Sequence, residues 1–311
     1  MKYGIKKLLG YLGYEIRRNR PVQYIKCVSL KTKKNVKGNA LLAYLLEPFL
    51  LGDGESPSQS HTHHTESLLI AEALLNSGYN VDVIDYRNRV FSPVKSYNFF
   101  ISARTNFVRI SDRLNRDCIK IAHLDTAHFL FNNSAAYRRA LEHQQRKGLT
   151  STSFRCIEHN LAVEHADYLT VLGNGFTRGT YDYSNKQIFT LPVPAPNVPL
   201  SSSNKDFSAC RKNFLWLGSG GLVHKGLDLV LDVFSELPDY HLTVCGPLDD
   251  PGEAEFRQQY FHELYKLPNI HAVGWVDISS NQFSDIASDC VALIYPSCSE
   301  GQAGSVITSL Q

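Results

Sequence analysis

The alternation of short apolar runs with helical segments most strongly constrains the fold of this 311-residue chain. From Ala40 onward, runs suited to buried strands are each followed by a segment with helical periodicity and then by a turn. The predicted helices include residues 158–166 and 253–266. Parallel strands need a crossover between them, and that crossover is usually a helix, so repeated βα units predict parallel sheets. We therefore predict an α/β fold made of Rossmann-like, doubly wound sheets.

A Pro- and Ser-rich stretch over residues 192–206, PVPAPNVPLSSSNKD, divides the alternating strand and helix pattern into two parts. It has no periodicity and reads as a linker, and the chain length also suits two domains. The predicted organisation is a basic N-terminal arm at residues 1–37, a first domain at 38–193, a linker at 194–212 and a second domain at 213–311.

Positive charge is concentrated in the predicted arm. Residues 1–37 hold eleven Lys or Arg against the single acid Glu15, although the net charge of the chain is only +2. Apolar residues at helical spacing are compatible with a basic amphipathic helix that contacts an anionic membrane, and interruptions by Tyr, Gly and Asn favour a solvated arm instead. No aromatic-interleaved platform accompanies the charge, so a nucleic-acid partner is not expected.

Several other classes of protein are disfavoured. No apolar run is long enough to span a membrane, and the N-terminus lacks the apolar region and cleavage site of a signal peptide, so we expect a cytoplasmic protein, at the inner face of the membrane if the arm binds there. The seven cysteines form no CxxC pair and read as free thiols. The spacing of His61, His63 and His64 fits no zinc template, which favours a polar loop over a metal site.

The glycine-rich segment over residues 213–226, NFLWLGSGGLVHKG, is typical of a phosphate-binding loop. An apolar strand runs into three glycines and then into His224, Lys225 and Gly226 before an apolar-periodic helix. Glycines let backbone N–H groups approach an anion, the helix N-terminus favours negative charge, and a lysine adds a cation. An ordinary βα turn that needs glycine for its shape is the alternative.

Polar residues also follow a strand in the first half of the chain. The run over residues 118–124 leads directly into Asp125, Thr126, Ala127 and His128. Ligands of doubly wound sheets bind outside the carboxyl ends of strands, so either Asp125 or His128 is a candidate general base or sugar-hydroxyl ligand. His128 is equally compatible with a helix cap.

Four segments, in order, resemble the C-terminal domain of the group 1, or family 4, glycosyltransferases. They are residues 214–234, 240–247, 269–277 and 289–307, and residues 165–177 resemble the last strand and turn of that family's N-terminal domain. The resemblance covers the chain from about Ala40 to its end. It implies a GT-B fold, in which two Rossmann-like domains face each other across a cleft.

The resemblance also implies an activity. Members of the family move a sugar from a nucleotide-sugar donor to a hydroxyl group, and backbone N–H groups and a cation stabilise the leaving diphosphate. The expected enzyme is a retaining, metal-independent hexosyltransferase that uses a UDP- or GDP-sugar, needs no cofactor, and acts on a polysaccharide, lipid-linked glycan or other cell-envelope acceptor. A truncated nucleotide-sugar binding module without activity and a GT-B-type sugar-nucleotide epimerase are the alternatives.

The positions that match the family's motifs form the predicted site. Lys225 matches the phosphate-binding lysine, and Glu300 matches the first acid of a Glu-x7-Glu motif; with Asp125 and His128 they are the predicted catalytic residues. The predicted donor-binding residues are Gly218, Ser219, Gly220, Gly221, Gly226, Gly246, Trp275, Val276, Gly301, Gln302, Ala303, Gly304 and Ser305.

Three departures from the family pattern affect these expectations. Ser219 stands where the family usually has an arginine, which removes one of two phosphate cations. Thr308 stands in place of the second acid of the Glu-x7-Glu motif. The chain ends at Gln311, where family members continue through further βα units, so a fragment of a longer protein with exposed apolar surface is expected.

Overall fold

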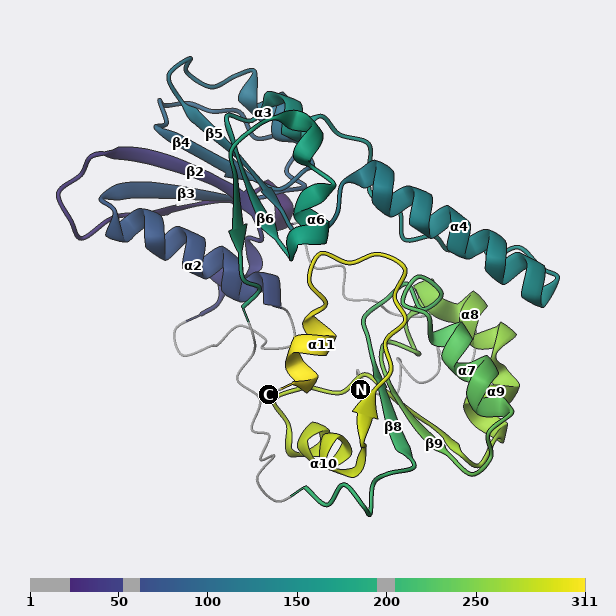
Figure 1. The fold of residues 1–311 in the computed structure, drawn as a ribbon. Helices are drawn as coiled ribbons and strands as arrows, with labels where there is room; N and C mark the ends of the chain where they lie inside the picture. Colours follow the sequence, from purple (N-terminus) through teal and green to yellow (C-terminus); the bar gives the residue numbers. More distant parts are fainter. Residues whose placement is uncertain (1–22, 53–61, 195–204, 311) are drawn as a thin grey trace, which may run out of the picture.

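The computed structural model describes residues 23–52, 62–194 and 205–310, which form two α/β regions with one sheet each (Figure 1). The predicted basic amphipathic helix within residues 1–20 and His61 lie outside these ranges. None of the helices in the described ranges combines the length and the hydropathy that a bilayer crossing requires.

The first sheet has the strand order β1-β3-β2-β4-β5-β6-β7. All neighbouring strands are parallel except β1, which pairs antiparallel with β3. Because β1 belongs to the segment predicted as an arm, that segment includes an edge strand of the sheet. The strands are β1 (Cys27–Leu30), β2 (Gly38–Tyr44), β3 (Tyr79–Asp85), β4 (Phe99–Ser102), β5 (Ile119–Leu124), β6 (Tyr168–Leu172) and β7 (Ile188–Leu191).

Helices cover both faces of this sheet. The helices are α2 (Thr62–Asn76), α3 (Phe107–Ser111), α4 (Phe129–Lys147), α5 (Ala162–His165) and α6 (Gly175–Gly179), with 3-10 turns η1 (Gln23–Ile25), η2 (Glu47–Leu50) and η3 (Asp182–Ser184). Leu41 and Ala43 belong to the core cluster that includes residues of α3 and α5, whereas Leu42 and Tyr44 belong to the cluster that includes Ala71 of α2. Side chains of a strand alternate between faces, so the continuous apolar run of β2 serves both layers.

Two predicted helices differ from the structure. The helix expected over residues 158–166 is limited to the single turn α5, and residues 151–161 are irregular. The helix expected over residues 253–266 is broken at Tyr260, whose backbone leaves the helical region while its ring is buried and stacks on Phe256. Packing of that ring therefore overrides a continuous helical pattern.

The second sheet has four parallel strands in the order β10-β9-β8-β11. Its strands are β8 (Asn213–Leu217), β9 (His241–Cys245), β10 (Ile270–Gly274) and β11 (Ala292–Leu293). Its helices are α7 (Leu227–Ser235), α8 (Ala254–Gln259), α9 (Phe261–Lys266), α10 (Asn281–Asp289) and α11 (Gly304–Ser309), with the 3-10 turn η5 (Pro251–Glu253). Leu215 and Leu217 share a core cluster with Phe283 of α10, whereas Trp216 shares one with Leu231 of α7.

The strand order decides where a ligand can bind. From β8 the chain adds β9 and β10 on one side, and it later adds β11 on the other side. The carboxyl ends of β8 and β11 therefore border a topological switch point, where open α/β sheets leave a crevice. The glycine-rich loop follows β8, and the loop that contains Glu300 follows β11, so both predicted loops start at this crevice.

Helix α4 joins the two regions. It extends from the first region along the helices of the second (Figure 1). Asp228 of α7, whose side chain is fully buried, binds Arg139 at 2.5 Å and also binds Arg146. Asp232, one turn later, binds Arg146 and Lys147, the latter at 2.6 Å. A cluster of charges therefore holds α4 against α7.

Candidate functional site

A cleft of about 340 Å³ lies between the two regions and is lined by residues of both. Most of the predicted site residues reach it. Those that line it are Asp125, Gly218, Ser219, Lys225, Gly246, Trp275, Val276, Glu300, Gly301, Gln302, Gly304 and Ser305. Five predicted residues do not line it, namely His128, Gly220, Gly221, Gly226 and Ala303.

Lys225 and Glu300 form an ion pair in the cleft. Lys225 Nζ lies 2.5 Å from Glu300 Oε1, and the lysine side chain is only 5% exposed. Tyr295 Oη and Ser297 Oγ donate to the same carboxylate oxygen at 3.0 and 2.8 Å. Burial lowers the pKa of Lys225, while Lys225 keeps the pKa of Glu300 below its ordinary value in spite of burial. The strand order thus brings together a cation and an acid that lie far apart in the sequence.

The glycine-rich loop needs two of its glycines for close packing. Gly226, at the N-cap of α7, has a φ of +74°, and a Cβ there would lie 2.4 Å from the carbonyl oxygen of Pro296. A Cβ on Gly218 would lie 2.4 Å from the ring of Trp216. Side chains other than hydrogen are therefore excluded where this loop meets the Glu300 loop and where it crosses the buried indole.

His224 links the same two loops. Its Nε2 lies 2.8 Å from the carbonyl oxygen of Ser299, which can only accept, so Nε2 carries the proton. Nδ1 is then the acceptor and faces the Cys298 thiol at 3.4 Å. Burial lowers the pKa of His224 and raises the pKa of Cys298 to about 11, so the pair stays neutral. We infer that His224 has a structural role in the loop.

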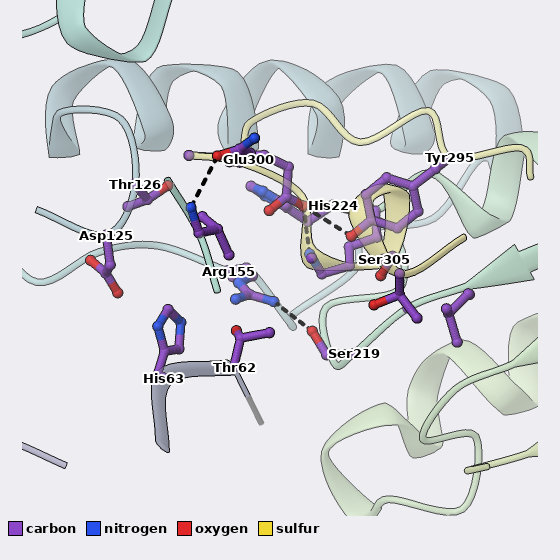
Figure 2. A pocket seen from close by; sticks show the side chains of 18 of the residues that line it. Thr62, His63, Asp125, Thr126, Arg155, Ser219, His224, Tyr295, Glu300 and Ser305 are labelled. Atoms are coloured by element: carbon purple, nitrogen blue, oxygen red, sulfur yellow. Dashed lines mark hydrogen bonds and ion pairs between the residues drawn. The ribbon is translucent and has the colours of Figure 1, made fainter. Parts of the chain in front are cut away.

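The first region contributes Asp125, Arg104 and His63 to the opposite wall. Asp125 forms an ion pair with Arg104, which holds the pKa of the carboxyl below its ordinary value although burial acts to raise it. Figure 2 shows His63 and Asp125 on the side of the cleft that faces Ser219 and Glu300. His63 lies in the first turn of α2, directly after the loop that the sequence predicts to be polar.

Behind His63 lie three buried residues that form a cluster with it: Tyr44, Glu66 and His123. Tyr44 Oη donates to Glu66 Oε2 at 2.7 Å, and His63 Nδ1 lies 2.8 Å from the same oxygen. His123 Nε2 is 3.8 Å away, at ion-pair distance. Burial acts to raise the pKa of Glu66, but these neighbours outweigh it and lower the pKa to about 2. In return, Glu66 raises the pKa of His63 in spite of burial, so His63 presents a protonated ring to the cleft more readily.

This cluster predicts a pH-dependent contribution to stability. In the folded protein the pKa of Glu66 lies below its ordinary value of 4.5. The stabilisation that ionised Glu66 provides is therefore complete above about pH 4.5 and is lost as the pH falls towards about 2. The difference in unfolding free energy between the wild type and Glu66→Gln should therefore shrink over that window, as measured by denaturant unfolding at successive pH values. Glu72→Gln, at an exposed position of the same helix, is the control and should show no such trend. A difference that is constant between pH 5.5 and pH 2, as estimated from the shift, would contradict the ionic role of Glu66.

His128 does not have the position that a catalytic base requires. Its Nδ1 accepts from the backbone N–H of Leu130 at 3.3 Å as the N-cap of α4. Its ring packs against Tyr181 and Tyr183, and Nε2 lies 3.2 Å from Tyr183 Oη. The helix-cap alternative therefore describes this residue, because both ring nitrogens are engaged away from the cleft.

Gly301, in the Glu300 loop, packs closely against the backbone of the first region. A Cβ there would lie 2.6 Å from the carbonyl oxygen of Asp125 and 2.9 Å from that of Leu172, and Thr177 Oγ1 donates to the Gly301 carbonyl at 2.8 Å. Thr308, in place of the family's second acid, also lines the cleft and is 2% exposed.

Substitution of Gly301 should therefore disturb the cleft. In Gly301→Ala the new methyl group meets fixed backbone on the opposite wall, so we expect a destabilisation of about 1–3 kcal/mol from overpacking and weaker ligand binding. Thermal unfolding and ligand titration measure both effects. Gly175→Ala is the matched control, because a Cβ there would meet nothing within 4 Å and the residue does not line the cleft. If the two variants unfold at the same temperature and bind ligand equally well, the close contact at Gly301 is contradicted.

Arg155 is a cleft residue that sequence reasoning undervalues. The segment around it is irregular, and Figure 2 shows the guanidinium between the first region and Ser219. Its Nη1 donates to the Gly220 carbonyl at 2.8 Å and lies 3.4 Å from Ser219 Oγ. No local pattern in the sequence marks this contact, because the partners are more than sixty residues apart.

Among the described residues, no group of three or more His, Cys, Asp or Glu is arranged to hold a metal ion. His63 and His64 both lie in α2, and His63 faces Glu66 and the cleft.

Comparison with known proteins extends these observations. No family model and no curated protein matches the chain. Among solved structures, a sucrose-phosphate synthase from Thermosynechococcus elongatus superimposes with a TM-score of 0.52 at 13% identity, covering 88% of this chain and 78% of that one. The chain has the GT-B fold. The resemblance noted in the sequence therefore predicted the fold correctly.

Two further structures are similar to this GT-B chain at lower scores. Anabaena HepE in complex with UDP and glucose gives a TM-score of 0.47 at 9% identity, covering 88% of this chain and 78% of that one. TarM gives 0.45 at 14% identity, covering 68% of this chain. The chain spans 39% of the length of TarM.

Proposed function

We propose that this protein is a glycosyltransferase that moves a sugar from a nucleotide-sugar donor to an acceptor hydroxyl. The observation that carries the proposal is the Lys225–Glu300 ion pair beside the glycine-rich loop at the switch point of the second sheet. A donor diphosphate gains negative charge as the glycosidic bond breaks, and a buried cation with nearby backbone N–H groups is suited to stabilise it. The GT-B fold shared with sucrose-phosphate synthase supports the same activity.

The opposite wall supports a role in acceptor binding. Asp125 and His63 face the donor loops across the cleft and are polar groups of the kind that bind sugar hydroxyls. A retaining, metal-independent reaction with a UDP- or GDP-sugar and a polysaccharide or lipid-linked glycan acceptor is the finer form of the proposal. Contact of the basic N-terminal segment with an anionic membrane surface, at the cytoplasmic face, belongs to it as well.

The proposal is tested by titrating the protein with UDP-, GDP- and ADP-sugars and then analysing the products by mass spectrometry with and without acceptor glycans. Transfer or slow hydrolysis of one donor is the expected result. Conversion of the donor sugar without acceptor would indicate an epimerase, and binding without turnover would indicate a binding module. Absence of binding to every nucleotide sugar would overturn the proposal.

A further inference from the structure

The charges of the cleft are unevenly compensated. Three arginine or lysine side chains line it within the described ranges, and two of them are neutralised by acids: Arg104 by Asp125, and Lys225 by Glu300. Arg155 forms no ion pair with any carboxylate of the described residues. It is therefore the cleft-lining cation that no carboxylate of the described residues pairs, although the Glu253 carboxylate accepts from the Gly221 N–H in the same loop.

The backbone that carries Arg155 is fixed from the first region. Asn132 of α4 donates to the Arg155 carbonyl at 3.3 Å. The neighbouring Asn133 donates to the Ile157 carbonyl at 2.9 Å and accepts from the Ile157 N–H at 2.8 Å. The segment is irregular, but these side-chain amides replace the missing backbone partners and hold it in one place.

The side chain then crosses to the second region. Its aliphatic part packs on Gly221, where a Cβ would lie 3.1 Å from Arg155 Cδ. Nη1 is engaged by the Gly220 carbonyl, whereas Nε and Nη2 find no acceptor among the described residues. The loop thus holds Nη1 of the guanidinium, and Nε and Nη2 are available to bind a ligand.

We propose that Arg155 binds the diphosphate of the nucleotide sugar together with Lys225, as a cation that the first domain delivers to the glycine-rich loop of the second. This inference rests on the proposed function. The Lys225 ammonium is already paired with Glu300, so a diphosphate needs a further positive group, and a guanidinium matches phosphate oxygens with its parallel N–H donors. The bound diphosphate then bridges the two domains.

The test is calorimetric titration of the full chain with inorganic pyrophosphate, with UDP, GDP and ADP, and with the corresponding nucleosides. In Arg155→Ala, affinity for pyrophosphate and for the bound nucleoside diphosphate should fall roughly 10- to 100-fold, as expected for a charge-assisted hydrogen bond. Nucleoside affinity should stay unchanged. Arg155→Lys should recover only part of the affinity, because an ammonium keeps the charge but lacks the parallel N–H donors. Arg138→Ala, which removes an exposed arginine of α4 outside the cleft lining, should match the wild type.

Two results would overturn the inference. One is unchanged diphosphate affinity in Arg155→Ala, and the other is an equal loss for nucleosides and diphosphates, which would mean that Arg155 only shapes the loop. Sugar transfer is not measured in this experiment. A chain that binds pyrophosphate through Arg155 but transfers no sugar would therefore disprove the proposed function and leave this inference standing.

Discussion

Replacement of Lys225 by alanine is expected to reduce sugar transfer, or donor hydrolysis, by roughly 30- to 1000-fold. The buried ammonium is the group best placed to stabilise the leaving diphosphate, and loss of such a donor costs about 2–4 kcal/mol of transition-state stabilisation. The measurement is steady-state turnover with the donor identified by titration, at saturating concentration. Lys212→Ala, on a lysine that lies over Tyr240 outside the cleft lining, is the control and should leave turnover unchanged.

One complication has to be separated from the catalytic effect. Lys225→Ala leaves the Glu300 carboxylate, whose side chain is 26% exposed, without its cation. The double variant Lys225→Ala/Glu300→Gln removes that unpaired charge. If the double variant turns over more slowly than Glu300→Gln alone, the loss comes from the missing cation; equal turnover of these two variants would instead mean that Lys225 only neutralises Glu300. Unchanged turnover in the single variant would remove Lys225 from the mechanism.

Replacement of Asp228 by asparagine is expected to lower the unfolding free energy by about 3–5 kcal/mol, the usual cost of breaking a buried ion pair from one side. Asparagine keeps the volume, so the change isolates the charge. Without the carboxylate, Arg139, which is 5% exposed, and Arg146 lose their shared partner at the contact between α4 and α7. Denaturant unfolding measured by circular dichroism gives the shift.

Asp232→Asn is the matched control for this prediction. Asp232 lies one turn further along α7 and also binds Arg146, but its side chain is 28% exposed. Solvent screens such a pair, so its loss should cost no more than about 1 kcal/mol. If Asp228→Asn and Asp232→Asn unfold at the same denaturant concentration, burial of Asp228 contributes nothing to the stability of the contact between the two domains.

Two sequence-based expectations were changed by distant contacts. Ser219 was interpreted as the loss of a phosphate cation, yet the structure places the guanidinium of Arg155 beside that position, at 3.4 Å from Ser219 Oγ. His128 follows a buried strand, as a cleft residue would, but it turns to cap α4. In both cases the decisive partner belongs to a different element, and no local pattern encodes it.

The sequence by itself determined the α/β class, the GT-B resemblance and the two loops that carry Lys225 and Glu300. These follow from short-range patterns, since strand and helix periodicity and glycine-rich turns are encoded within a few residues. Only the tertiary structure decided which charges meet: Lys225 with Glu300, Asp228 with Arg139 and Arg146, and Arg155 with the glycine-rich loop. Charges interact through space, and their partners are set by strand order and domain contact rather than by position along the chain.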